Sequence, residues 1–244
     1  MKLKNLTGVA SIALLLVFGV AGTALAAGPQ MGGDGQHMGG DGTPGIHEPG
    51  TGMMDGSQHM FPDAAGEWYE QHAQNMAQHG FMQGHANGYF GGSEDITRAQ
   101  FATVMARMMR ITPEGTAGFS DTGNHWAEGQ IAAMAHAGIV RGRTDGTFGP
   151  GAPITRAQMA AMMDRALQHV GAGRLGEEER TQLLEQLRTH MSDVEGHWAE
   201  GHIAHMYGLG ITQGNSAGQF RPDEHTNRAQ ASAMLWRFFE GQFQ

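Results

Sequence analysis

Apolar residues recur at helical spacing in two kinds of segment along this chain, and each kind occurs three times. A clear example of the first kind begins at Trp126, where Ile131, Met134 and Ala135 complete a stripe that a helix would bury. In the second kind, the corresponding faces are Phe101, Val104, Met105 and Met108; Met159, Met162, Met163 and Ala166; and Ala231, Met234, Leu235 and Phe238. The pattern predicts an all-α fold in which the three helices of the second kind pack as a central bundle.

A glycine-rich segment separates the two helices of each copy. In the middle copy Gly138 suits a left-handed helix C-cap, and the string GIVRGRTDGTFGPGAP holds too many glycines and prolines for a helix. The second helix then begins with a capping box, in which the Thr155 hydroxyl accepts from the backbone N–H of Gln158. The same arrangement is expected at Thr97 with Gln100 and at Asn227 with Gln230.

The three copies align on one another without a gap. An aspartate is followed by a tryptophan, a series of glycines, a phenylalanine and an arginine within the strings ITRAQ, ITRAQ and TNRAQ. A dense match at fixed spacing marks one supersecondary unit that needs its neighbours to complete a core. We therefore predict helix–loop–helix repeats at 61–110, 119–167 and 191–240.

The third copy begins later than strict repetition predicts. Asp121 lies 58 residues after Asp63, whereas Asp193 lies 72 residues after Asp121. The extra residues fall in a connector at 168–190, where we expect an additional helix. Glutamates stand at its front and basic residues near its end, as the helix dipole prefers. Its packing residues are expected to be Leu183, Leu184 and Leu187.

The N-terminal residues differ from the repeats. Residues 1–27 have the features of a secretory signal peptide: Lys2 and Lys4 precede an apolar run, and a small-residue cleavage motif ends at Ala26. The alternative is an uncleaved membrane anchor, because the apolar run is nearly long enough to span a bilayer. Residues 28–60 are crowded with glycine, methionine and histidine and predict a disordered, flexible linker. After cleavage no integral membrane segment is expected.

Charge and composition narrow the function. The formal charge is −9, and both lysines lie in the predicted signal peptide, so the mature chain is more acidic still. An acidic chain without basic runs argues against nucleic-acid binding. The absence of cysteine excludes disulfides and thiolate metal sites. The sequence contains no nucleophile elbow, zinc-protease motif or phosphate loop, so we expect no enzyme activity.

The repeated pattern F-x-D, W-A, G-I-x-x-G-x-x-x-G-x-F-x-P and I-T-R-A-Q resembles the S-layer homology (SLH) domain, and the resemblance covers about 61–240. It implies three repeats in a pseudo-threefold helical bundle and non-covalent anchoring at the cell wall or S-layer surface of a secreted protein. The implied partner is an anionic secondary cell-wall polysaccharide, commonly pyruvylated, or a peptidoglycan-linked glycan, bound in grooves between repeats. The family's ligand-contacting arginine falls on Arg98, Arg156 and Arg228.

Physical chemistry is consistent with this implied site. A guanidinium matches a carboxylate in two parallel hydrogen bonds, and free N–H groups at a helix start favour an anion. Aspartates and tryptophans near each groove are expected to meet sugar hydroxyls and an apolar sugar face, at Asp63, Asp121, Asp193, Trp68, Trp126 and Trp198. Glycines in the adjoining loop would let the backbone approach the sugar, at Gly84, Gly142 and Gly214.

Each candidate also has a structural explanation. Apolar spacing after the tryptophans favours core positions over ligand platforms, and the aspartates are as well explained as helix caps. The arginines have an alternative in ion pairs with acids such as Asp145 or Glu224, although we favour ligand binding. Glutamine replaces the family's usual glutamate in all three strings, and the first copy has Gly92 where the others have proline, so the groove of Arg156 is the most dependable.

A second function remains open, in which the repeats only moor an envelope protein that handles copper. Thioether and imidazole groups suit that metal, and the linker supplies both at Met31, His37, Met38, His47, Met53, Met54, His59 and Met60. No fixed spacing defines a site, so biased composition is the simpler explanation. Histidines that share a helix face, such as His202 and His205, are expected to be solvated. A self-assembling lattice subunit is a third alternative.

Overall fold

The computed structural model describes residues 60–172 and 174–243, and within these ranges it contains seven α-helices, one short 3-10 helix and no β-strand. The all-α prediction is therefore confirmed. The helices are η1 (Pro62–Ala64), α1 (Glu70–Gln78), α2 (Arg98–Met108), α3 (Glu128–His136), α4 (Arg156–His169), α5 (Glu177–His190), α6 (Glu200–Gly208) and α7 (Arg228–Phe243). None of those in the described part of the chain has the length and hydropathy needed to span a bilayer. The predicted signal peptide, and the predicted linker up to residue 59, lie outside the described residues.

The helices that follow the capping boxes are α2, α4 and α7, which we call the three long helices, and they begin where the capping boxes predict. Thr97 accepts from the backbone N–H of Gln100 at 3.2 Å, and the Gln100 amide oxygen accepts from the Thr97 N–H at 2.9 Å. The reciprocal pair also forms at Thr155, and at Asn227. Every residue of the three predicted apolar faces on α2, α4 and α7 is buried. Both predictions depend on chemistry within one helix, and both are confirmed.

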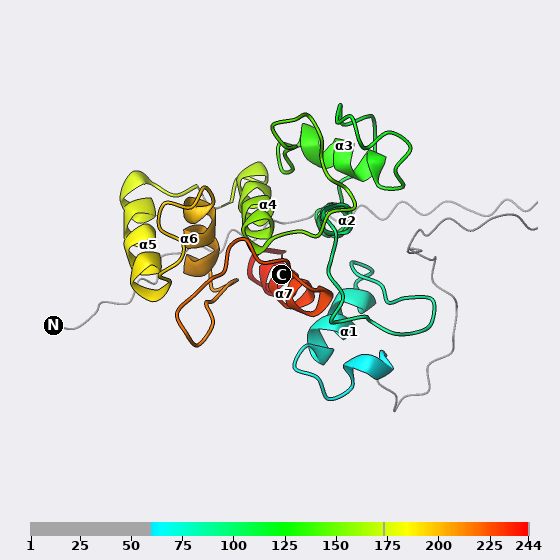
Figure 1. Cartoon of the computed structure of the whole chain (residues 1–244), viewed down its shortest axis with the longest axis horizontal. Coiled ribbons are helices and arrows are strands. Elements are labelled where there is room, and N and C mark those ends of the chain that lie inside the picture. The colour runs from blue at the N-terminus through cyan, green and yellow to red at the C-terminus, as the bar shows by residue number, and fades with distance from the viewer. Residues whose placement is uncertain (1–59, 173, 244) are drawn as a thin grey trace, which may run out of the picture. The chain divides into compact units, whose positions relative to one another are not determined.

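Each long helix packs mainly on the short helix of another repeat. The described helices pair as α2 with α3, α4 with α6, and α7 with α1. The first repeat therefore supplies α2 to the second repeat's α3, and the third repeat closes the cycle on the first. Figure 1 shows α2, α4 and α7 near the centre, with α1, α3 and the α5–α6 pair outside them. We call each short helix with its adjoining loops a lobe, and each lobe thus packs on a long helix from another repeat.

A closed ring of backbone hydrogen bonds joins the residues just before the three long helices. Ile96 N–H donates to the Thr226 carbonyl, Thr226 N–H to the Ile154 carbonyl, and Ile154 N–H to the Ile96 carbonyl, each at 3.0 Å. Because equivalent residues of the three repeats exchange equivalent bonds, the ring marks a pseudo-threefold axis. The pseudo-threefold arrangement implied by the sequence resemblance is present.

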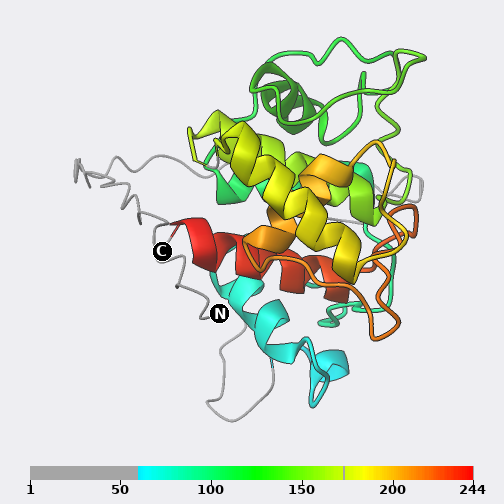
Figure 2. The same cartoon turned by 90° about the vertical axis from the view of Figure 1, so that its left-hand side faces the viewer.

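The additional helix predicted in the connector is α5, and it lies on the outer side of α6 in both views (Figures 1 and 2). Leu187 is fully buried, while Leu183 and Leu184 pack half-buried against the core. A Cβ on Gly208 would lie 2.5 Å from Cδ2 of Leu183, so the glycine permits this close approach. Arg188 Nε also donates to Glu200 Oε1 at 2.6 Å, which links α5 to α6.

The prediction that the repeat tryptophans lie in the core is wrong. Trp68, Trp126 and Trp198 are 62%, 40% and 59% exposed. Each of the short helices begins two residues after its tryptophan, so the indole belongs to the preceding turn and escapes the helical stripe. The next residue along the chain takes the buried position, as Tyr69, Ala127 and Ala199.

Candidate functional site

The three predicted ligand arginines are the first residues of α2, α4 and α7, and each lies where its repeat meets another. We call these contacts the first junction (Arg98 with the second repeat), the second junction (Arg156 with the third) and the third junction (Arg228 with the first). Arg98 N–H donates to the Ala152 carbonyl at 2.9 Å, and the other two arginines make equivalent bonds. The expectation of free N–H groups at these helix starts is therefore wrong, because the neighbouring loop already accepts from them.

The arginine side chains fasten one repeat to the next. Arg98 Nε donates to the Phe148 carbonyl at 2.8 Å, Nη2 donates to the Arg141 carbonyl at 3.2 Å, and the guanidinium lies 4.5 Å from the centre of the Phe148 ring. Arg228 makes the same set with Phe90 and Gln83. Charge-assisted hydrogen bonds and cation–π contacts of this kind stabilise the association of the repeats.

Arg156 makes fewer side-chain hydrogen bonds than Arg98 and Arg228 do. Its Nε donates to the Phe220 carbonyl at 2.6 Å and its guanidinium lies 4.6 Å from the centre of that ring. Its side chain is half-buried, whereas Arg98 and Arg228 are 4% and 7% exposed. Among the described residues, the terminal nitrogens of Arg156 have no hydrogen-bond partner, so they can donate to a ligand.

None of the three junction arginines forms a salt bridge with any carboxylate in the described part of the chain. The alternative of ion pairs with Asp145 or Glu224 is therefore not observed. Burial lowers the pKa of Arg98 to about 10 and also lowers the pKa values of Arg156 and Arg228. All three remain cationic at neutral pH. A buried charge without an ion-pair partner is costly, and such groups concentrate at functional sites.

The predicted site aspartates hold the loops of their own repeats. The carboxylate of Asp121 accepts from the backbone N–H groups of Phe148 and Gly149, both at 2.7 Å. Asp63 and Asp193 make the equivalent pairs. Partial burial works to raise the pKa of Asp121, but these hydrogen bonds outweigh it and hold the pKa below its usual range. The aspartates thus clamp the phenylalanine whose carbonyl accepts from the junction arginine, and they do not act as helix caps.

A family model described as the S-layer homology domain matches residues 61–102, 118–160 and 190–232. The chain belongs to this family. The resemblance drawn from the sequence is confirmed, and membership of the SLH family assigns the chain to the cell wall or cell surface.

Curated relatives contain similar SLH repeats within longer chains. An S-layer protein of Bacillus licheniformis is 32% identical over 178 residues, which are 72% of this chain and 19% of that protein. A cellulosome-anchoring protein of Acetivibrio thermocellus is 32% identical over 167 residues, 66% of this chain and 35% of that protein. An endoglucanase of Bacillus sp. (strain KSM-635) is 33% identical over 153 residues, 61% of this chain and 16% of that protein. The chain therefore spans about a third or less of each of these relatives.

The predicted site glycines of the SLH loops are required by internal packing. A Cβ on Gly84 would lie 2.5 Å from Cε1 of Phe61 and 2.8 Å from the Tyr89 carbonyl oxygen. Gly142 is equally close to a phenylalanine ring and a carbonyl, and Gly214 is 3.1 Å from the Gln219 carbonyl. The loops would have to shift if these positions carried a side chain, whether or not a sugar approaches them.

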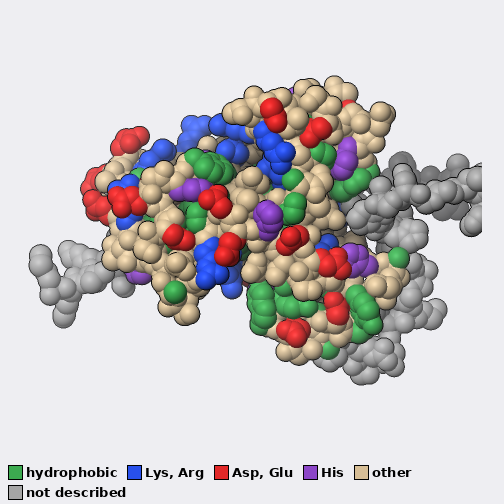
Figure 3. Space-filling view, in the orientation of Figure 1, with side chains coloured by type: hydrophobic (Ala, Val, Ile, Leu, Met, Phe, Trp, Pro, Cys, Tyr) green, Lys and Arg blue, Asp and Glu red, His purple; other side chains and the backbone are tan. Residues whose placement is uncertain are grey.

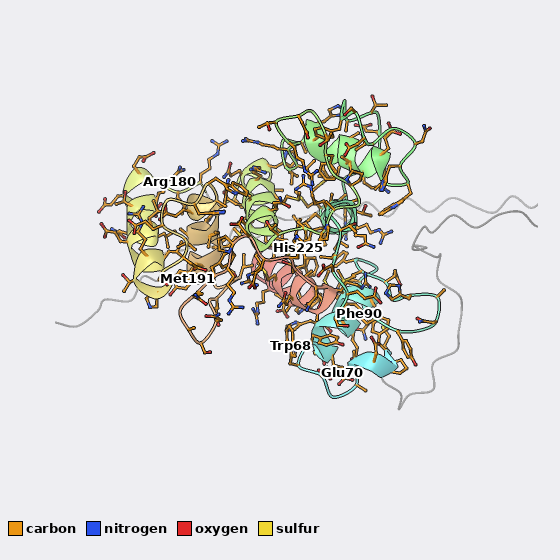
Figure 4. All side chains as sticks on the ribbon, in the orientation of Figure 1. Trp68, Glu70, Phe90, Arg180, Met191 and His225 are labelled. Atoms are coloured by element: carbon orange, nitrogen blue, oxygen red, sulfur yellow. The ribbon has the colours of Figure 1, made fainter. Side chains whose placement is uncertain are left out.

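The exposed tryptophans leave apolar surface free near the SLH loops. Trp68 and Phe90 both belong to the α1 lobe, but only Phe90 is buried there, and Trp68 projects at the surface (Figure 4). An exposed indole offers a flat apolar face of the kind that packs on a sugar ring. The exposure of the tryptophans contradicts a core role, and their use as a ligand platform stays a prediction.

Sequence reasoning missed a carboxylate–histidine cluster between the second and third SLH repeats. The two carboxylate oxygens of Asp164 each lie 2.5 Å from a histidine Nδ1, of His202 and of His205. His205 is buried, so the expectation that both histidines are solvated is wrong for this residue. The available signal was an acid within the buried helix α4, because such an acid needs a partner.

The described residues contain no group of three or more histidine and acidic side chains that could hold a metal ion. Of the predicted copper ligands in the linker, Met60 lies within the described residues and packs half-buried against the hydrophobic core. The other seven lie outside those residues, so copper binding stays a prediction. The candidate site is therefore a set of three junction arginines at helix starts, each held by the clamped loop of a neighbouring repeat, and each repeat also carries an exposed tryptophan.

Proposed function

We propose that this SLH chain is a non-enzymatic anchor whose junctions bind an anionic, pyruvylated cell-wall polysaccharide. The observation that supports this most directly is the absence of a carboxylate partner for the junction arginines among the described residues. A carboxylate on the glycan would supply the missing negative charge. The name of one relative, a cellulosome-anchoring protein, fits the same role.

Arg156 is the proposed first contact. Its terminal nitrogens are uncommitted, and a planar guanidinium can donate two parallel hydrogen bonds to the carboxylate of a pyruvate ketal. Arg98 and Arg228 are proposed to attract the anion while holding the repeats together. The tryptophans are proposed to pack on sugar rings, and the aspartates and glycines to shape the loops that meet the ligand.

Long-range charge opposes this binding, because the chain carries a formal charge of −9 and the polymer is anionic. Screening confines that repulsion to a Debye length of about 8 Å at physiological ionic strength. Arginines at the contact surface can then dominate, and the affinity is expected to fall as salt is raised.

The test uses purified full-length protein and isolated cell walls. Replacing Arg156 by alanine removes charge-assisted hydrogen bonds worth roughly 1.5–3 kcal/mol, so the amount of protein that pellets with walls should fall by about tenfold or more. Arg180→Ala is the matched control, because Arg180 is exposed on α5 away from the junctions. Circular dichroism should give both variants the wild-type helix content.

Walls treated with mild acid to remove pyruvate provide the second arm. Wild-type protein should lose most of its pelleting on these walls if the ketal carboxylate is the contact. Unchanged pelleting of Arg156→Ala on untreated walls would reject the proposed role of the junction arginines. Unchanged pelleting of wild type on depyruvylated walls would instead point to a different acidic group.

A further inference from the structure

The glycine-rich loop of each repeat carries a basic side chain at an equivalent place in space. The residue that supplies this side chain is not the same in all three repeats. A Cβ on Gly149 would lie 2.5 Å from Nη2 of Arg143, so this guanidinium occupies the space of a side chain at residue 149. In the third repeat the counterparts are exchanged: Arg221 stands at the glycine position and Asn215 at the arginine position. The first repeat follows the Gly149 pattern, with Nε2 of His85 over Gly91 at 2.5 Å.

Carboxylates compensate the basic groups of two of these junctions. At the third junction, His85 Nε2 lies 3.0 Å from Glu94 Oε2, and the negative charge of Glu94 also acts on Arg228. At the second junction, Arg221 Nη1 lies 3.1 Å from Glu224 Oε1, and Glu224 also acts on Arg156. The basic group of the loop therefore lies beside a carboxylate in both cases.

The first junction has more positive charge and no such pairing. Arg98, Arg141, Arg143 and Arg165 gather there, and none of them forms a salt bridge within the described residues. They repel one another: the charges of Arg143 and Arg165 add to burial in lowering the pKa of Arg98, and Arg141 adds to burial in lowering that of Arg165. Figure 3 shows a group of Lys and Arg side chains above α4 and beside α3, while acidic and histidine side chains are spread over the face.

The carboxylates nearest this cluster are already used as hydrogen-bond acceptors. Asp121 accepts from two backbone N–H groups, Asp145 accepts from the backbone and hydroxyl of Thr147, and Asp164 is held between two histidines. They offset part of the positive charge but leave the exposed guanidinium donors of Arg141 and Arg143 without an anionic partner in the described residues.

We propose that the first junction takes a glycan segment that carries two neighbouring acidic groups, and binds it more tightly than the other two junctions do, with Arg141 and Arg143 as its contacts. This inference rests on the proposed anchoring function. One acidic group meets the loop guanidinium groups and the second is attracted by the charge of Arg98. The other two junctions each have a carboxylate beside the basic group of the loop, so they bind this doubly acidic segment more weakly.

The experiment is a calorimetric titration of full-length protein at low salt with three synthetic probes. The first is a disaccharide with a pyruvate ketal on each ring, the second has one ketal, and the third has neutral ethylidene acetals in their place. Wild type should bind the first at least tenfold more tightly than the second, and the third not measurably. Failure of wild type to bind the first probe would overturn this inference, and failure to pellet with walls as well would overturn the anchoring function.

Variants then locate the site. Arg143→Gln should weaken binding of the two-ketal probe at least tenfold, while its counterpart Arg221→Gln and the surface control Arg180→Gln should change it less than twofold. Equal losses for Arg143→Gln and Arg221→Gln would overturn the ranking of the junctions. Wall pelleting that survives in wild type, together with unchanged probe binding by Arg143→Gln, would overturn this inference while leaving the anchoring function intact.

A double variant tests the shared position directly. Arg143→Asn with Gly149→Arg gives the second repeat the arrangement of the third, where Arg221 already adopts a positive φ of 59°. Binding of the two-ketal probe should return to within about fivefold of wild type, because the guanidinium regains its place. If the double variant has wild-type helix content but still binds the two-ketal probe weakly, an arginine at residue 149 does not place its guanidinium where Arg143 places it.

Discussion

At the scale of the residue, buried charges in this molecule are satisfied by groups from a different repeat. The junction arginines donate to carbonyl oxygens across each boundary, and Asp164 of the second repeat accepts from histidines of the third. Burial acts to raise the pKa of Asp164, but hydrogen bonds from His202 and His205 dominate and lower it to about 2. The carboxylate is thus held in its charged form by residues 38 and 41 positions further along the chain.

This depressed pKa predicts acid sensitivity. Because the folded-state pKa lies below the ordinary value of 3.8, the contribution of Asp164 is complete above about pH 4 and is lost as the pH falls toward 2. The shift corresponds to about 2 kcal/mol of unfolding free energy. Urea titrations between pH 6 and pH 2 should show this loss in wild type and a flatter profile in Asp164→Asn, which should be less stable at pH 6. The control Glu185→Gln, exposed on α5, should follow wild type; if Asp164→Asn does so too, the cluster does not contribute to stability.

At the scale of the element, α5 shows how an inserted helix is accommodated. It adds to the outer side of α6 and buries one leucine fully, while its exposed face carries charged and polar residues. It therefore depends on the lobe beneath it more than on its own helix propensity.

Leu187→Ala tests that dependence. Removing a fully buried leucine should lower the unfolding free energy by about 2–5 kcal/mol, through lost burial and the cavity left behind. Thermal or urea denaturation monitored by circular dichroism measures this. The neighbouring Gln186→Ala, at an exposed position on the same helix, should stay within about 0.5 kcal/mol of wild type. A Leu187→Ala melt that matched the Gln186→Ala melt would mean that α5 is peripheral to the stability of the fold.

Several features could be predicted from the sequence because their causes are local. A threonine three residues before a glutamine forms a capping box from groups within one helix start, as at Thr97 and Thr155. The apolar face of α4 follows from helical periodicity in the same way. The exchange of partners between repeats could not be predicted this way. The copies are so alike that contact within a repeat and contact with the next satisfy the same pattern, and only the folded chain distinguishes them.

Other causes explain the errors at the candidate site. The ion pairs considered for the arginines do not form, because the arginines donate to carbonyl oxygens, which every residue carries and no sequence pattern reveals. Ligand binding by the arginines stays a prediction. The tryptophans were assigned to helices that begin two residues later, and an error of that size at a helix start moves a side chain from the core to the surface.

At the scale of the whole molecule, the described repeats form a closed cycle. The start of α4 is held by carbonyls of the third repeat, and α1 packs on α7. A chain truncated after residue 190 would lose both, so we expect the first two repeats to fail as an independent unit. Far-UV circular dichroism of the truncated protein should show a broad, weakly cooperative melt and a loss of helix larger than α6 and α7 account for. A sharp melt with α1, α2 and α4 protected from amide exchange would contradict the cycle.

The ring formed by Ile96, Ile154 and Thr226 also bears on topology. Its three bonds are equivalent, and the bond between the first and last repeats is as short as those between consecutive ones. The contacts between repeats therefore do not depend on which repeat comes first in the chain. In a circular permutant, opened in the loop between α2 and α3 and joined at the original ends, we expect the ring and all three boundaries between repeats to keep the same contacts.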